Sequence, residues 1–189
     1  MMKKYHTFLV WVFVIISISC KNQSGRQSIE TPRSFSTSDA SKLFFRNVRK
    51  IFYDLEEQQS TKLRIYRIKT RPKRTDYPVI NLALVENWRY DEAYLIIEPE
   101  GALEMDMDKK IEIHWQDSGS GQSGVYVFNK TGNKTEHVKF ASEIYQSIMK
   151  NHQLHYVHQE ESLPILNDEK DRESFRIMVE DYYRLVGVL

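Results

Sequence analysis

The sequence predicts an α+β protein in which an antiparallel sheet of about five to six strands carries three helices, in the order α-β-β-β-β-β-α-β-α. Two observations lead to this class. Apolar residues recur at helical spacing in three segments, and six short β-branched or aromatic runs lie between turn residues. The composition is that of a folded chain, because 41% of its 189 residues are hydrophobic and only 12 are Gly or Pro (7 Gly, 5 Pro).

The first predicted helix begins after the N-cap candidates Ser36–Asp39 and ends between Glu57 and Ser60. Its apolar stripe has amphipathic spacing and consists of Phe44, Val48, Ile51 and Leu55, widened by Phe45 and Phe52. The polar side of the same helix carries Lys42, Arg46, Arg49 and Lys50. This pattern is typical of a helix that packs its apolar side on a sheet.

Six segments are predicted to be strands: Leu63–Lys69, Val79–Val85, Glu92–Glu98, Ile111–Trp115, Val125–Phe128 and Leu154–His158. The fourth has the clearest pattern, because Ile111, Ile113 and Trp115 alternate with polar residues, as in a strand with one face in water. Short connections favour antiparallel pairing.

The segment 117–124 is rich in Gly and Ser and predicts a hairpin loop between the fourth and fifth strands. Gly119, Gly121 and Gly124 match the G-x-G-x-x-G pattern of dinucleotide-binding loops. A helix should follow such a motif, whereas here the next residues favour a strand. We therefore expect no nucleotide cofactor.

Two more helices are predicted in the C-terminal half. The apolar positions of the first extend up to His152 and are Val138, Ala141, Ile144, Tyr145, Ile148 and Met149. The second is capped by Asn167 or Asp168, ends at Gly187, and has the apolar positions Phe175, Met178, Val179, Tyr182, Leu185 and Val186.

The N-terminus has the three zones of an export signal. Lys3 and Lys4 form a positive region, an apolar run follows over 8–18, and the polar segment after Cys20 contains no stop-transfer pattern. The apolar run is shorter than the roughly 20 residues that a membrane-spanning helix needs.

The four residues Ser17-Ile18-Ser19-Cys20 resemble the lipobox of bacterial lipoprotein precursors, with a small residue directly before the cysteine and Ser17 where Leu is usual. The resemblance implies that Cys20 receives a diacylglycerol, becomes the first residue of the mature chain, and is acylated with palmitate-type chains. The remaining alternative is an ordinary secretory signal with Cys20 as a passenger thiol.

These features predict three parts: a signal peptide over 1–19, the lipidated cysteine with a flexible tether over 20–37, and one α+β domain over 38–189. Cys20 is the single cysteine of the chain, so it has no partner for an intramolecular disulfide, and lipidation gives it a use. The predicted location is a bacterial cell envelope, with the domain outside the cytoplasm and the membrane reached through the lipid anchor.

Charge is unevenly distributed although the formal net charge is +1. The segment 42–75 has eleven basic and three acidic residues, and the segment 76–189 has eleven basic and twenty-one acidic residues. The basic segment either faces an anionic membrane surface or packs against the acidic segment as complementary surface. Nucleic acid is not an expected partner of an exported chain with this balance.

A candidate interaction surface combines an aromatic tip with a basic loop: Trp88, Arg89, Tyr90, Arg71, Lys73 and Arg74. The alternative for the tip is an ordinary cap on the end of the core. We also expect the carboxylates of Glu104, Asp106 and Asp108 to share one side of an extended segment. As no glycine bends that segment, it resembles a solvated strand more than a calcium loop.

The function that fits these observations is that of a membrane-anchored envelope lipoprotein acting as a binding, accessory or assembly module for an envelope protein. No catalytic motif is found, and we predict no catalytic residue, metal site or cofactor. The alternative is a small envelope hydrolase or ligand-processing enzyme with a site near one of four histidines: His114, His152, His155 or His158.

Overall fold

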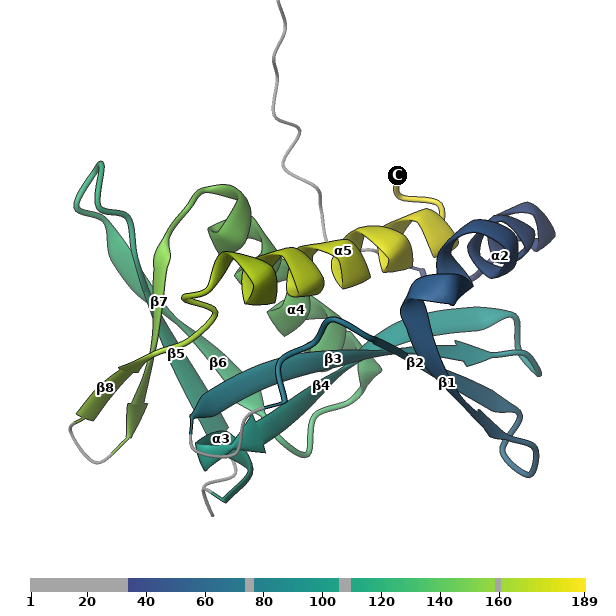
Figure 1. Cartoon of the computed structure of the whole chain (residues 1–189), viewed down its shortest axis with the longest axis horizontal. Helices are drawn as coiled ribbons and strands as arrows, with labels where there is room; N and C mark the ends of the chain where they lie inside the picture. The colour runs from purple at the N-terminus through teal and green to yellow at the C-terminus, as the bar shows by residue number, and fades with distance from the viewer. Residues whose placement is uncertain (1–33, 74–76, 106–109, 159–160) are drawn as a thin grey trace, which may run out of the picture.

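The computed structural model describes residues 34–73, 77–105, 110–158 and 161–189. It confirms the α+β class but replaces the single predicted sheet by two antiparallel four-stranded sheets (Figure 1). Sheet A has the order β1-β2-β3-β4, with bounds Tyr53–Gln58, Leu63–Ile68, Pro78–Asn87 and Glu92–Gly101. Sheet B has the order β6-β5-β7-β8, with bounds Ser123–Asn129, Lys110–Gln116, Gln153–His158 and Glu161–Pro164.

The N-terminal helical segment changes its winding twice. It consists of the α-helix α2 (Asp39–Phe44), the π-helical turn η1 (Phe45–Arg49) and the 3-10 turn η2 (Lys50–Phe52). The remaining described helices are α3 (Ala102–Met105), α4 (Lys134–Met149) and α5 (Glu169–Leu185). All six predicted strands are confirmed, whereas α3, β1 and β8 were not predicted.

The prediction that the first helix continues to Glu57 or beyond is wrong, because the chain becomes strand β1 at Tyr53. Strand β1 is acidic and pairs in antiparallel register with the basic strand β2. Arg67 bonds Glu56, and Arg64 bonds Glu57, across the pair. These cross-strand pairs outweigh the helix propensity of the Glu- and Gln-rich sequence.

The outer edge of β4 explains why the strands form two sheets. The Ala93 N–H donates to the Phe35 carbonyl, and the Ile97 N–H donates to Nδ1 of His137 on α4. With these edge groups already bonded, β4 does not accept another strand. At Gly101 the backbone takes a left-handed conformation, α3 follows, and β5 starts a new sheet.

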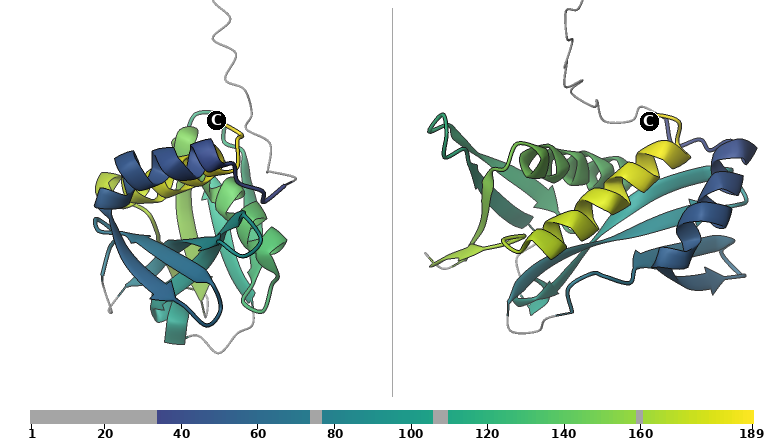
Figure 2. Two further views of the ribbon diagram at one scale, coloured as in Figure 1. Left: turned by 90° about the vertical axis from the view of Figure 1, so that its right-hand side faces the viewer. Right: turned by 45° about the horizontal axis from the view of Figure 1, so that its top comes forward.

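The hydrophobic core is shared by both sheets and the helices above them. Helix α5 lies across the top of this core in Figure 1, with α4 behind it, and Figure 2 shows α2 beside the C-terminal end of α5. Central core residues, all nearly inaccessible, include Tyr66, Leu84, Leu95, Ile113, Phe128, Ile144 and Val179.

The capping residues of the two long helices set their starts. Asn133 and Glu136 form a capping box on α4, which therefore begins earlier than its apolar pattern indicates. Asp168 caps α5 as predicted, and its side chain accepts the Lys170 N–H. Gly187, in the left-handed region, follows α5 and confirms the predicted stop.

Stability should fall on acidification through His137. Burial lowers the pKa of His137 below its ordinary value of 6.5, and protonation of Nδ1 would break its bond with the Ile97 N–H. As the pH falls below 6.5, His137 is therefore protonated in the unfolded chain before it is protonated in the folded protein. The free energy of unfolding should be highest above pH 6.5 and should decrease below it. His137→Asn keeps an acceptor near Nδ1 but does not titrate.

Urea unfolding at pH 7.5 and 5.0 checks this prediction. We expect the difference in the free energy of unfolding between the two pH values to be smaller in His137→Asn than in the wild type. An equal difference in both proteins would show that His137 does not couple folding to pH.

Candidate functional site

The most unusual surface of the described residues is the outer side of the N-terminal helical segment. We call it the outward helix face, and it consists of Leu43 (60% exposed), Phe44 (46%), Val48 (48%), Ile51 (64%) and Phe52 (46%). Three of these residues, Phe44, Val48 and Ile51, belong to the apolar stripe found in the sequence. Among the helical residues 39–52, only Phe45 is buried.

Phe45 anchors the segment to the core. Its ring lies 5.5 Å from the ring of Tyr53 and 5.0 Å from that of Tyr66, measured between centroids. The hydroxyl groups of both tyrosines then reach buried carboxylates, Tyr53 that of Asp181 and Tyr66 that of Glu86. Burial, reinforced by these carboxylates, raises the pKa of both tyrosines, which stay protonated as donors.

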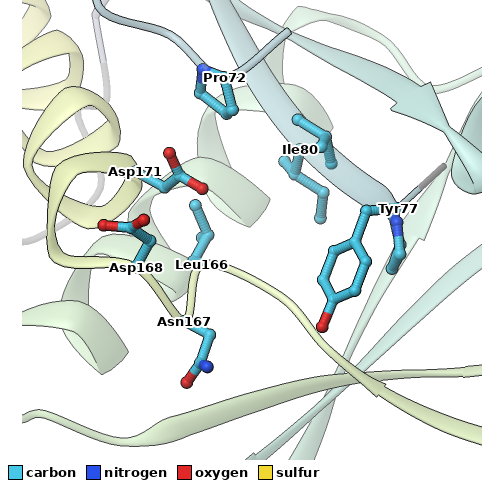
Figure 3. A pocket seen from close by; sticks show the side chains of 9 residues that line it. Pro72, Tyr77, Ile80, Leu166, Asn167, Asp168 and Asp171 are labelled. Atoms are coloured by element: carbon cyan, nitrogen blue, oxygen red, sulfur yellow. The ribbon is translucent and has the colours of Figure 1, made fainter. Parts of the chain in front are cut away.

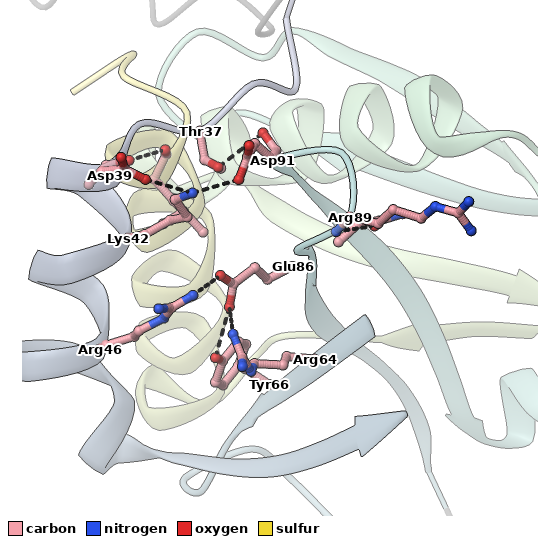
Figure 4. A network of polar contacts seen from close by, with 12 residues as sticks. Thr37, Asp39, Lys42, Arg46, Arg64, Tyr66, Glu86, Arg89 and Asp91 are labelled. Atoms are coloured by element: carbon pink, nitrogen blue, oxygen red, sulfur yellow. Dashed lines mark hydrogen bonds and ion pairs between the residues drawn. The ribbon is translucent and has the colours of Figure 1, made fainter. Parts of the chain in front are cut away.

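The first carboxylate, Glu86 on β3, has a side chain only 4% exposed. It accepts from Arg46 of η1 at 2.6 Å, from Arg64 of β2 at 3.5 Å and from the Tyr66 hydroxyl at 3.1 Å (Figure 4). The guanidinium of Arg46 is therefore directed towards the body of the protein, although 42% of the side chain stays exposed.

The second carboxylate, Asp181 on α5, has a fully buried side chain. Both of its oxygens accept from Nε of Arg49 at 2.9 Å, and Tyr53 and Arg184 complete its contacts. Arg49 follows Phe45 by four residues, so the two side chains leave the helix on the same side. The arginine and the buried phenylalanine together fix the rotation of the segment.

The start of the segment is pinned as well. Lys42 bonds Asp39 at 3.0 Å and Asp91 at 2.6 Å, and the backbone and hydroxyl of Thr37 both donate to the Asp91 carbonyl (Figure 4). The hydroxyl of Ser41 donates to the Leu185 carbonyl at the end of α5.

These contacts orient the helix in the opposite way to an amphipathic helix that packs its apolar side on the core. Arg46 and Arg49 on its cationic side face buried carboxylates, and the apolar stripe faces solvent. Contiguous exposed apolar surface of this kind marks a site of interaction in soluble domains. The outward helix face is the strongest candidate functional site of the described residues.

The residues of the predicted interaction surface fall into two groups at opposite ends of β2. Trp88, Arg89 and Tyr90 follow β3, whose end pairs with Leu63 at the start of β2, whereas Arg71 and Lys73 follow the end of β2. The structure therefore does not bring the two groups together. Arg74 lies outside the described residues.

Within the aromatic tip, only part is available to a partner. Trp88 is half-buried under the guanidinium of Arg64, 4.5 Å from its ring. Tyr90 is 64% exposed, and Arg89 lies over its ring at 5.6 Å. In the basic loop, Arg71 is half-buried and bonded to Asp54, while Lys73 is exposed.

Most of the basic segment packs against acidic residues, as the second hypothesis for it expects. Five of its cations bond carboxylates of the segment 76–189: Lys42, Arg46, Arg49, Arg64 and Arg67. A sixth, Arg71, bonds Asp54 within the basic segment itself. Lys50 and Lys69 remain exposed beside the outward helix face, and Nζ of Lys69 donates to the Ile51 carbonyl.

The histidines do not form a shared site. His152 is buried, stacks on Trp115 at 4.7 Å, and bonds the Ser147 hydroxyl at 3.0 Å through Nδ1. The pair resembles a nucleophile with its base, but Ser147 has no exposed surface for a substrate to reach. His114 and His155 are opposite each other on β5 and β7, and the side chain of His158 lies outside the described residues.

His137 lines a cavity of about 380 Å³ together with Tyr90, Tyr94 and Lys134. This is the combination of a concave site and a shifted histidine pKa that the enzyme hypothesis requires. However, Nδ1 of His137 accepts from Ile97, and the ring also bonds the Gly132 backbone. Lys134 is bonded to Glu92. The polar atoms of His137 and Lys134 are therefore already used in contacts within the fold.

A second cavity, of about 340 Å³, lies between the residues before β3 and the start of α5 (Figure 3). Pro72, Tyr77 and Ile80 form its apolar side, and Asp168 and Asp171 form its acidic side. Asp168 caps α5, and both carboxylates already have interaction partners in the structure.

A third cavity, of about 550 Å³, opens between β4 and β6. Its charged groups are already bonded: Arg67 to Glu98, Glu100 to Asn81, and Lys130 to the Leu103 carbonyl. Glu104 lies at its rim in α3, so the expected extended row of carboxylates is wrong for this residue. Asp106 and Asp108 lie outside the described residues.

The Gly-rich segment 117–124 forms the predicted β5–β6 hairpin loop, closed by bonds from Gly119 and Ser120 to the Asp117 carboxylate. Gly124 is required there, because a Cβ would come within 2.8 Å of the Trp115 indole nitrogen.

Within the described ranges, no three His, Cys, Asp or Glu side chains are grouped so as to hold a metal ion. No helix among those residues has both the length and the apolar character to cross a membrane. Comparisons of the chain with protein-family models, curated proteins and solved structures give no match. Function must therefore be argued from the surface itself.

Removing the charge of Glu86 should destabilise the protein, because two arginines would lose their buried counter-ion. Glu86→Gln should lower the free energy of unfolding by about 2 kcal/mol or more in urea titrations. The matched control is Glu57→Gln, an exposed partner of the same Arg64, which should leave the unfolding midpoint near that of the wild type. Equal effects of the two variants would contradict the role given to Glu86.

Polar substitutions on the outward helix face should leave stability almost unchanged. Val48→Ser and Ile51→Ser should each shift the free energy of unfolding by no more than about 0.5 kcal/mol, because both side chains are exposed. Phe45→Ala, from the same segment, should cost about 3–5 kcal/mol. A large loss in either serine variant would place the face in the core.

Proposed function

We propose that the protein is a lipid-anchored lipoprotein of a bacterial cell envelope, whose domain outside the cytoplasm acts as a binding, accessory or assembly module. Cys20 would be the first residue of the mature chain and would carry the acyl groups. Cys20 itself lies outside the described residues, so the support for the anchor comes from the sequence.

The outward helix face is the observation that carries this proposal. It belongs to the first folded element after the proposed tether, and 17 residues lie between Cys20 and the helix cap Ser38. A chain of this length has an r.m.s. reach on the order of 20 Å. Five exposed apolar side chains at that distance from an anchor are typical of a domain that binds another surface.

A protein partner in the envelope would find a second contact at the β3–β4 turn. Tyr90 and Arg89 are exposed there, and aromatic and arginine side chains dominate protein interfaces. Lys73 would extend the contact only for a partner that reaches the far end of β2. We propose this partner together with the anchor.

The enzyme alternative has less support. The buried Ser147–His152 pair has no access for a substrate, and both hydrogen bonds of the His137 ring are with the backbone. We therefore favour binding over catalysis for this domain.

Intact-mass spectrometry of protein taken from membranes of the native host tests the anchor. We expect the chain to begin at Cys20 with a diacylglyceryl mass and further acyl mass. Cys20→Ala should lose this mass and should move from the membrane fraction to the soluble fraction. A soluble wild-type chain with an unmodified Cys20 would refute the lipoprotein function and leave an ordinary secretory signal as the explanation.

A further inference from the structure

We propose that the outward helix face lies on the surface of the bilayer that carries the anchor, so that the domain contacts the membrane at two points. This inference rests on the proposed lipoprotein function and identifies what covers the face: phospholipids with anionic headgroups.

The face has the shape that a bilayer requires. It is one side of a single helical segment that projects from the end of the molecule, and none of the three cavities described above includes any of its five residues. A protein partner would need about 800 Å² of complementary surface on each side. A bilayer adapts to a convex apolar ridge, and interfacial helices bury their apolar side about 5–10 Å into the headgroup boundary.

The charges around the face fit anionic headgroups. Lys50 and Lys69 are exposed next to Ile51 and Phe52, and Arg46 keeps 42% of its side chain exposed while it holds Glu86. The only acidic residue within the segment is Asp39 in its first turn, which is bonded to Lys42. Basic groups near an anionic membrane surface strengthen binding to it.

The orientation of the face is built into the fold and does not require a conformational change. Arg49 and Phe45 hold the segment to Asp181 and to the aromatic core, so the apolar side chains are presented before any contact is made. Side chains displayed in this way lose less conformational freedom on binding than those of a disordered segment.

A single fluorescent probe on the anchored protein tests the proposal. With Cys20 acylated, Ile51→Cys provides one free thiol on the face, and Val127→Cys provides a matched thiol on strand β6, away from α2 (Figure 1). Val127 is 53% exposed, close to the exposure of the face residues. Each lipidated variant is labelled with an environment-sensitive dye and reconstituted in vesicles of phosphatidylethanolamine and phosphatidylglycerol.

We expect quenchers attached to the lipid chains to quench the probe at position 51 several-fold more than the probe at position 127. Adding Val48→Glu should bring the quenching at position 51 close to that at position 127, because it replaces an apolar side chain in the contact by a charge that anionic lipids repel. Replacing phosphatidylglycerol by phosphatidylcholine, or raising the salt concentration, should also reduce it.

Equal quenching at both positions in these vesicles would overturn the membrane contact while leaving the lipoprotein function intact. A dye at position 51 that reports an apolar environment in native membranes, but is not quenched in the pure-lipid vesicles, would also overturn it and would identify a protein as the occupant. The mass of Cys20, measured on the same samples, reports separately on the anchor: an unacylated cysteine refutes the proposed function whatever the probe shows.

Discussion

The pairing of two buried carboxylates with arginines is the constraint on which the N-terminal half of the structure depends. A carboxylate taken out of water costs several kcal/mol unless a partner and hydrogen bonds compensate. Glu86 and Asp181 obtain these from Arg46 and Arg49, which belong to one helical segment, and from Tyr66 and Tyr53. The segment must therefore turn its cationic side inward.

This requirement competes with the usual burial of an apolar stripe. Burying a Val, Ile or Phe side chain is worth about 1.5–3 kcal/mol, so leaving several of them in water is a substantial loss. Rotating the helix to bury Phe44, Val48 and Ile51 would break the ion pairs of Arg46 with Glu86 and of Arg49 with Asp181. Each buried carboxylate would then keep one arginine, Arg64 for Glu86 at 3.5 Å and Arg184 for Asp181 at 3.1 Å, and would lose its shorter contact. In the folded protein the ion pairs of Arg46 and Arg49 are formed, and the side chains of Phe44, Val48 and Ile51 stay exposed.

The second constraint is the occupied edge of β4. Edge strands expose unpaired N–H and C=O groups, which attract further strands. Here the backbone of Phe35 and the ring of His137 bond two of these N–H groups. The chain entering from the tether and helix α4 thus terminate sheet A, and β5 to β8 must build a sheet of their own. The segment that leads from the tether is therefore part of the sheet architecture.

Local patterns in the sequence were sufficient for most elements of the fold. The alternation in Ile111–Trp115 and the spacing of the apolar residues in α5 correspond to a strand and a helix in the structure. Strand β1 was missed because its acidic sequence favours a helix until it is paired with β2, as in the contact of Arg64 with Glu57. The division into two sheets was missed because it depends on a contact between residues far apart in sequence, that of His137 with Ile97. The length of β8, four residues, leaves little periodicity to detect.

The candidate site was visible in the sequence only in part. The stripe of Phe44, Val48 and Ile51 and the neighbouring cations were found, but amphipathicity alone does not say which side of a helix faces the core. That depends on Glu86 and Asp181, which lie 40 and 132 residues away from their arginines in sequence. A useful signal was the presence of arginines at 46 and 49, since arginine is the cation most suited to buried pairing.

The anchor and the outward helix face strengthen each other if both act on the same membrane. A single acyl chain gives only marginal, reversible membrane binding, and stable attachment takes two signals. In the proposed arrangement, the segment that joins Cys20 to the domain would make the second contact intramolecular, with an effective concentration in the millimolar range. A helix face too weak to bind vesicles from solution is then strong enough to hold the domain in one orientation.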